Sequence, residues 1–262
     1  MRYVDQIGRE LMVASRPLRI VSLVPSQTEL LVDLGLKSSI VGVTKFCVHP
    51  SDLKNKKIVV GGTKDVHYDK IKELRPDIIL CNKEENTQAM ISQLEQVAPV
   101  HVSDIYTIDD SLELIKMYGE LFNVIDNASK IVADIRSKFE EFRKWIINYP
   151  NLKAAYFIWK DPWMVVGRST FIDELLRINN FENYFSNLSR YPEISLDDID
   201  TSIDLIFFSS EPFPFKDKHF KEVYTKFPNS KIMIVNGEYF SWYGSRLILA
   251  VNYFKALREQ LV

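Results

Sequence analysis

Residues 126–149, DNASKIVADIRSKFEEFRKWIINY, divide two sets of strand-and-helix units and decide the fold. Their apolar side chains recur at steps of three and four residues, which marks one face of a helix: Ile131, Val132, Ile135, Phe139, Phe142 and Ile146. The first Pro is Pro150 and no Gly interrupts the run, so about 24 residues would form a helix of roughly 36 Å. It is either a stiff rod between two lobes or a long crossover helix inside one domain.

Short apolar runs alternate with helical segments along both halves of the chain, which predicts an α/β fold built from parallel sheets. We expect strands at residues 20–24, 40–43, 78–80, 100–102, 154–159, 205–208 and 232–235. We expect helices at residues 27–34, 69–74, 87–97, 109–122, 171–178, 218–226 and 243–261. With the rod interpretation, the chain has an N-terminal lobe over residues 1–125, a backbone helix over 126–149 and a C-terminal lobe over 150–262.

The composition, 46% hydrophobic and 26% charged with a net charge of −2, is typical of a globular protein. No block of Lys or Arg is present, so nucleic acid is not expected as a partner. No apolar run is long enough for a transmembrane segment, and the N-terminus lacks the apolar core of a secretory signal. If Met1 is the true start, the sequence predicts a cytoplasmic protein; the alternative is the mature part of an exported one.

The segment after the first expected strand carries helix-capping signals. Ser26 and Glu29 have the spacing of a capping box, and Gly35 has the position of a helix stop. A second interpretation is that the free backbone amides at this helix start receive a carboxylate or a phosphate.

Polar and aromatic residues crowd the loops that follow the expected strands. In parallel sheets, ligands gather at the carboxyl ends of the strands. The loops concerned are residues 44–50, 61–64, 82–86, 159–163, 209–213 and 236–243. Flat aromatic walls with a few charges suit a large planar ligand, although any one of these aromatics can equally pack within its lobe.

Direct metal binding is a separate hypothesis. Cys47 and His49 stand two residues apart, and Glu84 and Glu85 could add oxygens, a ligand set that suits zinc or iron. The alternative is that Cys47 is a small buried apolar residue.

Signatures of an enzyme are missing, since no GxGxxG, GxxxxGK[ST] or GxSxG pattern occurs. The adjacent carboxylates Glu84 and Glu85 make a weak acid–base pair, and Ser245 is interpreted as a helix cap. These motifs therefore predict no known class of enzyme.

Six stretches resemble the class III substrate-binding proteins of ABC importers, also called helical-backbone metal receptors. They are RIVSLVPSQTELLVDLG, IVGVTKFCVHP, KELRPDIILCNKEEN, WKDPWMVVGRSTFIDELLRINNFENYF, DLIFFSSEPFPF and NGEYFSWYGSRLILA. The resemblance covers nearly the whole chain, and the KFCVHP, GGTK, NKEEN and DPWM elements look like a vitamin B12-binding-like subgroup. It implies two α/β lobes joined by one long helix, a ligand cleft between the lobes, and binding without catalysis.

Carried over by position, the resemblance implies ligand contacts from loops of both lobes. They are Ser26, Phe46, Lys64 and Glu84 in the first lobe, and Trp159, Trp163, Glu211 and Trp242 in the second. Tryptophans would stack on a metal chelate, and Lys64, Lys83 or Lys160 would meet its anionic groups. The ligand would be a cobalamin-like corrinoid or an iron chelate such as a ferric siderophore or haem, with no intrinsic cofactor.

The resemblance also implies an ABC permease as partner and a periplasmic or extracytoplasmic location. Acidic residues would dock onto the permease, and Asp69, Asp197 and Asp198 lie near the expected positions. Two other hypotheses stay open: an intracellular metal-handling protein or metalloenzyme that uses Cys47, His49 and Glu84 or Glu85, and a degenerate receptor kept as a scaffold.

Overall fold

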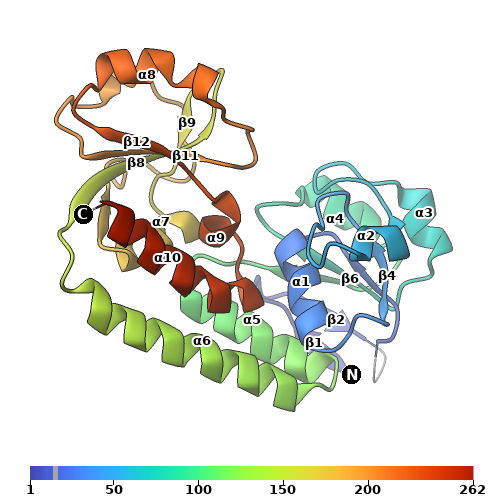
Figure 1. Ribbon diagram of the computed structural model, residues 1–262. Helices are drawn as coiled ribbons and strands as arrows, with labels where there is room; N and C mark the ends of the chain where they lie inside the picture. Colours follow the sequence, from blue (N-terminus) through green and yellow to red (C-terminus); the bar gives the residue numbers. More distant parts are fainter. Residues whose placement is uncertain (14–16, 262) are drawn as a thin grey trace. The chain divides into compact units, whose positions relative to one another are not determined.

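Two parallel β-sheets, each with its own core, form the computed structural model, which describes residues 1–13 and 17–261 (Figure 1). The chain divides into two units. Unit 1 consists of Met1–Ile105, Asp109–Arg136 and Tyr243–Ile248, and unit 2 of Tyr106–Ile108, Ser137–Trp242 and Leu249–Val262. The predicted α/β class with two parallel sheets is confirmed. Within the described ranges, no helix combines the length and apolarity needed to cross a bilayer.

Unit 1 contains five parallel strands in the order β5-β4-β3-β6-β7. The strands are β3 (Ile20–Ser22), β4 (Ile40–Val43), β5 (Ile58–Val59), β6 (Ile78–Asn82) and β7 (Val100–Ser103). The helices between them are α1 (Pro25–Asp33), α2 (Leu53–Lys56), α3 (Tyr68–Glu73) and α4 (Gln88–Leu94), and α5 (Ile108–Leu121) follows β7. Every residue of β6 is buried, as expected for a strand inside a parallel sheet.

Helix α1 begins differently from the prediction. Val24 is the N-cap and Pro25 occupies the first helical turn, without a side-chain capping bond, so the predicted capping box of Ser26 and Glu29 is wrong. Pro suits this position because its missing N–H has no helical partner there. The predicted stop is confirmed: Gly35 has a φ of +85°, and the amides of Gly35 and Leu36 donate to carbonyls of the last turn.

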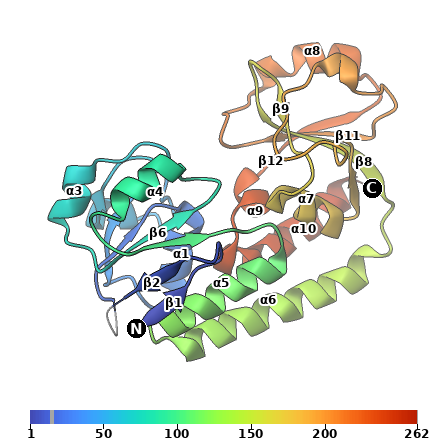
Figure 2. The ribbon, with the colours of Figure 1, turned by 180° about the vertical axis from the view of Figure 1, so that it is seen from behind.

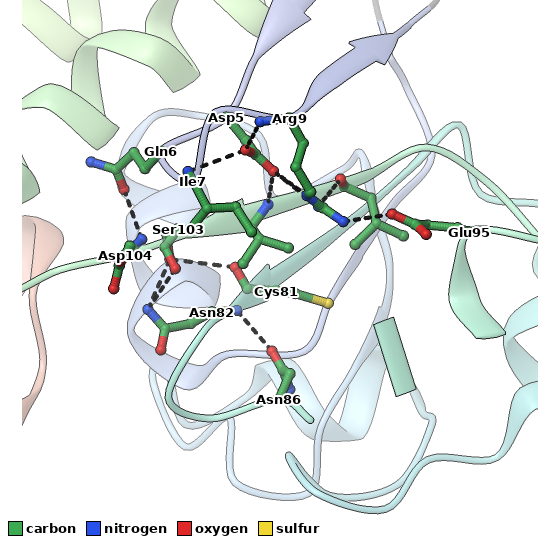
Figure 3. A network of polar contacts seen from close by, with 12 residues as sticks. Asp5, Gln6, Ile7, Arg9, Cys81, Asn82, Asn86, Glu95, Ser103 and Asp104 are labelled. Atoms are coloured by element: carbon green, nitrogen blue, oxygen red, sulfur yellow. Dashed lines mark hydrogen bonds and ion pairs between the residues drawn. The ribbon is translucent and has the colours of Figure 1, made fainter. Parts of the chain in front are cut away.

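The N-terminal hairpin, β1 (Arg2–Val4) and β2 (Glu10–Met12), was not predicted. Its turn closes the outer edge of the sheet, because side chains of the turn bind backbone groups of β7 and of Asp104, the residue after it (Figure 3). Three groups are bound: the carbonyl of Val100 by Arg9 at 2.8 Å, the amide of Val102 by Asp5 at 3.1 Å, and the amide of Asp104 by Gln6 at 3.3 Å. These side chains take the place of a sixth strand and block edge-to-edge pairing.

Unit 2 contains four parallel strands in the order β10-β8-β11-β12, with β9 antiparallel to β8. The strands are β8 (Leu152–Trp159), β9 (Met164–Val165), β10 (Phe181–Asn183), β11 (Leu205–Ser209) and β12 (Lys231–Val235). The helices are α7 (Phe171–Ile178), α8 (Lys221–Lys226), α9 (Gly237–Ser241) and α10 (Leu247–Leu261). Helix α8 lies on one face of this sheet, and α7 and α10 lie on the other (Figures 1 and 2).

The long helix predicted at residues 126–149 is α6, which spans Ile125–Ile146. All six residues of its predicted apolar face are buried. Up to Arg136 the helix belongs to unit 1, and from Ser137 it belongs to unit 2, so one unbroken helix is shared by both cores. Near its start it packs closely on α5, because a Cβ at Gly119 would lie only 2.7 Å from the Cβ of Ala128.

The segment Tyr243–Ile248 returns the chain to unit 1. Its residues Gly244–Arg246 form a single 3₁₀ turn, where the sequence predicted the start of one continuous helix over 243–261. Arg246 makes a two-pronged ion pair with Glu29, at 2.7 and 2.9 Å. Burial raises the pKa of the Glu29 carboxyl, and Arg246 opposes that rise. This buried pair fixes the returning segment on α1.

Candidate functional site

The loops at the carboxyl edge of the unit 1 sheet bring three predicted ligand residues together. Phe46 follows β4, and its ring keeps 48% of its surface exposed. A Cβ at Gly62 would lie 3.3 Å from that ring, so the two loops touch. Lys64 donates from Nζ to the carbonyl oxygen of Glu84 at 2.9 Å, which ties the 61–64 loop to the 82–86 loop.

Asn82 shapes the loop that carries Glu84 and Glu85. Its Oδ1 accepts the backbone amides of Glu84 at 2.8 Å and Glu85 at 3.3 Å. Its own amide donates to Oδ1 of Asn86 at 2.8 Å, and its Nδ2 donates to Oγ of Ser103 at 3.0 Å (Figure 3). An Asn at the end of a strand is typical of such turns, and its buried position here holds the loop in one conformation.

Lys83, predicted to meet an anionic group, already has a partner. Its Nζ lies 2.6 Å from Oδ2 of Asp104, and half of the Lys83 side chain is exposed. An incoming anion would therefore compete with Asp104, and Lys83 is a weaker candidate than Lys64.

A buried polar network beneath the unit 1 loops was not predicted. Gln27 donates from Nε2 to Oγ of Ser103 at 2.7 Å and to the hydroxyl of Tyr243 at 2.9 Å, and its Oε1 accepts from the hydroxyl of Tyr118 at 2.8 Å. Ser26, the neighbouring predicted ligand residue, is itself buried with 3% exposure. Ser26 is thus buried beside Gln27 of this network, so its side chain is not open to solvent. The only sequence signal was a Gln in the first turn of a helix.

The predicted direct metal site is not assembled. Cys47 is fully buried, with Sγ 3.1 Å from Oγ1 of Thr28 and 3.3 Å from Oγ1 of Thr44. Burial raises the pKa of its thiol, so the neutral thiol is favoured over the thiolate that binds metals. Among the residues that the structure describes, no three His, Cys, Asp or Glu side chains are grouped to hold an ion. Cys47, His49, Glu84 and Glu85 therefore do not form the predicted cluster.

The carboxyl edge of the unit 2 sheet is lined with aromatic rings. Trp159 ends β8 with 39% of its surface exposed, and its ring lies edge-on to that of Phe213 at 5.3 Å. Trp163 instead packs against the core, 5.3 Å from Phe157. Nζ of Lys160 lies 4.3 Å from the centre of the Trp163 ring. Of the two tryptophans in this loop, Trp159 is the one open to a ligand.

Glu211 and Trp242 contact each other within unit 2. The indole Nε1 of Trp242 donates to Oε1 of Glu211 at 2.9 Å, and the hydroxyl of Ser241 donates to the same oxygen at 3.0 Å. Trp242 is only 7% exposed, which argues against its predicted use as an open stacking surface. A Cβ at Gly237 would lie 2.7 Å from Cγ of Glu211, so glycine is required there for the carboxylate to reach Trp242.

The three aspartates predicted for permease docking differ in their surroundings. Asp69 is exposed in the first turn of α3. Asp197 pairs with Lys226, which lowers the pKa of its carboxyl, and Asp198 accepts the backbone amide of Ser195 at 2.7 Å. Asp197 and Asp198 thus both have structural partners, and Asp198 forms a capping box with Ser195.

Two surface hollows lie at the opposite, amino ends of the strands. One, of about 410 Å³, includes Val100 at the start of β7, and the other, of about 370 Å³, includes Leu152, Leu205 and Lys231 at strand starts. None of the predicted ligand residues lines either hollow. Both hollows therefore lie away from the predicted ligand residues of either unit.

Comparisons with known proteins concern the family and the fold of the whole chain. The sequence profile of the periplasmic binding protein family matches residues 20–229. An uncharacterized ABC transporter substrate-binding lipoprotein of Bacillus subtilis is 26% identical over 68% of this chain and 59% of its own length. A vitamin B12-binding protein of Vibrio campbellii is 22% identical over 92% of this chain and 91% of its own. A periplasmic haem-binding protein of Pseudomonas aeruginosa superposes with a TM-score of 0.80 at 21% identity, over 92% of each chain.

Proposed function

Because the chain belongs to the periplasmic binding protein family, we propose that it is the substrate-binding protein of an ABC-type importer and that its ligand is a metal chelate. The ligand class is cobalamin-like, or like a ferric siderophore or haem. Similarity to proteins named for vitamin B12, for haem and for an ABC transporter supports this assignment. The metal enters inside the ligand, and the protein binds without catalysing a reaction.

One observation carries the proposal: each sheet presents an exposed aromatic ring beside a lysine at its carboxyl edge. In unit 1 the ring is Phe46, whose centre lies 5.0 Å from Nζ of Lys45. In unit 2 the ring is Trp159, followed directly by Lys160. Aromatic faces with a few fixed charges bind large, flat, amphipathic ligands by contact area and orient them by charge.

The same proposal assigns a permease as partner and a periplasmic or extracytoplasmic place of action. Asp69 is the strongest docking candidate, because its carboxylate is exposed on a helix surface. Asp197 would have to exchange Lys226 for a basic group of the permease. An exposed pair of this kind contributes little to stability, so the exchange costs little.

A thermal-shift panel tests the proposal. Metal-free protein is melted with cobalamin, cobinamide, haem, several ferric siderophores and bare divalent metals. A ligand at 100 times its Kd stabilises the fold by about 2.7 kcal/mol, which raises Tm by roughly 5 °C or more. We expect a shift with one class of chelate. A shift with bare metal alone would instead favour direct metal binding by Cys47 and His49. The absence of a shift with every chelate would contradict the proposal.

A further inference from the structure

Three aromatic rings and three lysines gather beyond the predicted ligand residues of unit 2. We call this group the cationic platform: Trp159, Phe213, His219, Lys160, Lys216 and Lys218. Phe213 and His219 were not among the predicted ligand residues. The rings are connected edge to face, with Phe213 at 5.3 Å from Trp159 and at 5.3 Å from His219.

Core aromatics hold the platform rigidly from behind. Phe215 is buried and lies 4.7 Å from Phe213, and it stacks on Trp163 at an interplanar angle of 6°. Phe208, inside β11, lies 4.7 Å from Phe215. Each of these pairs adds to the burial energy of its members. The exposed ring of Trp159 and the partly buried ring of Phe213 therefore rest on packed aromatic side chains and lose little freedom when a ligand binds.

The hydrogen bond to His219 determines what this side chain can offer a ligand. Its Nδ1 accepts the backbone amide of Lys216 at 3.0 Å, so in the neutral ring the proton is on Nε2. Burial lowers the pKa of His219, and Lys218, Lys160 and Lys216 lower it further while Asp161 opposes them. The neutral ring with Nε2–H is thus the form present near pH 7, and it is a hydrogen-bond donor, not a metal ligand.

Three lysines and one carboxylate dominate the electrostatic environment of the His219 ring. Lys160 lies with Nζ 4.3 Å from the centre of the Trp163 ring, and its side chain is 20% exposed. Its neighbours include the carboxylates of Asp161 at 3.2 Å and Glu222 at 4.0 Å. An anion on the platform would compete with these carboxylates for Lys160 and would give Nε2 of His219 an acceptor.

We propose, on the basis of the proposed function, that the cationic platform binds the anionic oxygens of a metal chelate that carries aromatic rings. Trp159 and Phe213 contact the aromatic rings of the chelate, while His219 and Lys160 bind its carboxylate or catecholate oxygens. This assigns the ligand to the anionic iron chelates and away from corrinoids, whose rim carries neutral amides.

Matched ligands and matched variants test the platform in the full chain, with tryptophan fluorescence as the readout. The ligand pair is haemin and its dimethyl ester, which share the flat ring but differ in rim charge, and a ferric tris-catecholate serves as a second anionic chelate. The ester should bind at least about tenfold more weakly than haemin, the loss expected for charged hydrogen bonds. If the tris-catecholate binds and haemin does not, the source is a siderophore.

Variants of His219 and Lys160 test the loss of a ligand-binding group separately from a loss of stability. His219→Asn keeps an acceptor for the Lys216 amide but removes the donor at Nε2, and should weaken anionic chelates about tenfold. His219→Gln places an amide donor near Nε2 and should stay within about threefold. Lys160→Met keeps the packing on Trp163 and should weaken binding about tenfold. Lys255→Met is the control, since it removes another lysine placed over a tryptophan, 5.9 Å from the Trp145 ring.

The outcomes distinguish the two proposals. If a chelate binds but ester and acid bind equally, and His219→Asn and Lys160→Met match the wild type, the platform assignment is overturned and the proposed function stands. If cobalamin binds and both anionic chelates do not, the ligand class is overturned as well. If no chelate binds, both proposals fall. If a variant is too unstable to be tested, the salt dependence of haemin binding is measured on the wild type instead. Weaker binding at high salt supports the platform, and unchanged binding overturns it, because a contact without charges is insensitive to salt.

Discussion

The carboxyl edges of the two sheets are supported by different kinds of side chains. In unit 1 a hydrogen-bonded network centred on Gln27 and Asn82 fills the space beneath the loops. In unit 2 the same place is filled by aromatic rings centred on Phe208. A polar network fixes geometry by direction but is costly when one member is lost, whereas an aromatic cluster stabilises through contact area. The same topological edge can therefore be rigid for two physical reasons.

This difference can be measured separately in each unit. All four tryptophans, Trp145, Trp159, Trp163 and Trp242, lie in unit 2. Tryptophan fluorescence therefore follows unit 2, while far-UV circular dichroism follows both units.

Phe208→Ala should give the largest effect. Phe208 is fully buried among Phe157, Phe215 and Phe220, at ring distances of 5.1, 4.7 and 4.7 Å. Its truncation should lower the free energy of unfolding by about 4 kcal/mol through lost contacts and a cavity. Urea titration followed by fluorescence measures this, with Phe208→Leu as a milder control. A decrease of less than about 1 kcal/mol in the free energy of unfolding would show that the aromatic cluster does not support the carboxyl edge of the unit 2 sheet.

Gln27→Leu breaks the polar network of unit 1. It leaves the buried hydroxyls of Tyr118, Ser103 and Tyr243 without their Gln27 partner. We expect a loss of about 3 kcal/mol, since each abandoned buried group costs its desolvation. Circular dichroism melting measures it. Tyr118→Phe removes a single hydroxyl and should cost about 1 kcal/mol, so equal losses in the two variants would contradict a cooperative network.

Mild acid should destabilise unit 1 more than unit 2. His101 is buried in β7, and burial lowers its pKa from 6.5 to about 4; Arg9 assists, while Asp5 and a hydrogen bond to the backbone of His101 itself oppose. Between pH 6.5 and pH 4, His101 is protonated in the unfolded chain but stays neutral in the folded chain. The stability contribution is therefore present above pH 6.5 and is lost as the pH falls toward 4, about 2 kcal/mol of it by pH 5.

The comparison of wild type with His101→Leu checks this. The Tm of the wild type should fall between pH 7 and pH 5 by more than that of the variant. Parallel pH profiles for the two proteins would assign the acid sensitivity to other groups.

Trp159→Ala and Trp242→Ala separate an exposed ring from a buried one. Trp159→Ala should weaken binding of the chelate identified by the panel by about 2 kcal/mol, as expected for an aromatic anchor, with little change in stability. Trp242→Ala should instead lower stability, because that indole is buried and bonded to Glu211. Calorimetric titration and melting together measure both effects. If Trp159→Ala binds normally, its assignment as a ligand contact is lost.

Glu211→Gln should give the smallest effect. The amide oxygen of Gln can still accept from Trp242 Nε1 and Ser241, so only the charge assistance disappears. We expect a loss of about 1 kcal/mol or less in stability. Fluorescence-detected urea unfolding measures it. A loss as large as that of Trp242→Ala would mean that the negative charge itself holds this loop.

The sequence predicted most elements of both units because their signals are local. The strand at residues 40–43 and the helix at 171–178 have the observed bounds, and the long helix differs by a few residues at its ends. Short elements such as β1, β2, β9 and β10 were missed, since two or three residues carry no periodicity. The site was predicted less well, because the exposure of a side chain depends on residues that are distant in the sequence. Trp159 and Trp242 look alike as loop tryptophans, yet Trp159 is exposed and Trp242 is buried.

By itself the sequence determined the α/β class, the apolar face of α6 and the stop at Gly35, since spacing and backbone preference are properties of neighbouring residues. Only the tertiary structure decided that Glu29 pairs with Arg246 and that Gln27 bonds to Tyr243, across 217 and 216 residues of chain. These partners also explain why Ser26 and Glu29 do not form a capping box. Contacts between distant residues depend on how whole elements pack, and no local pattern contains that information.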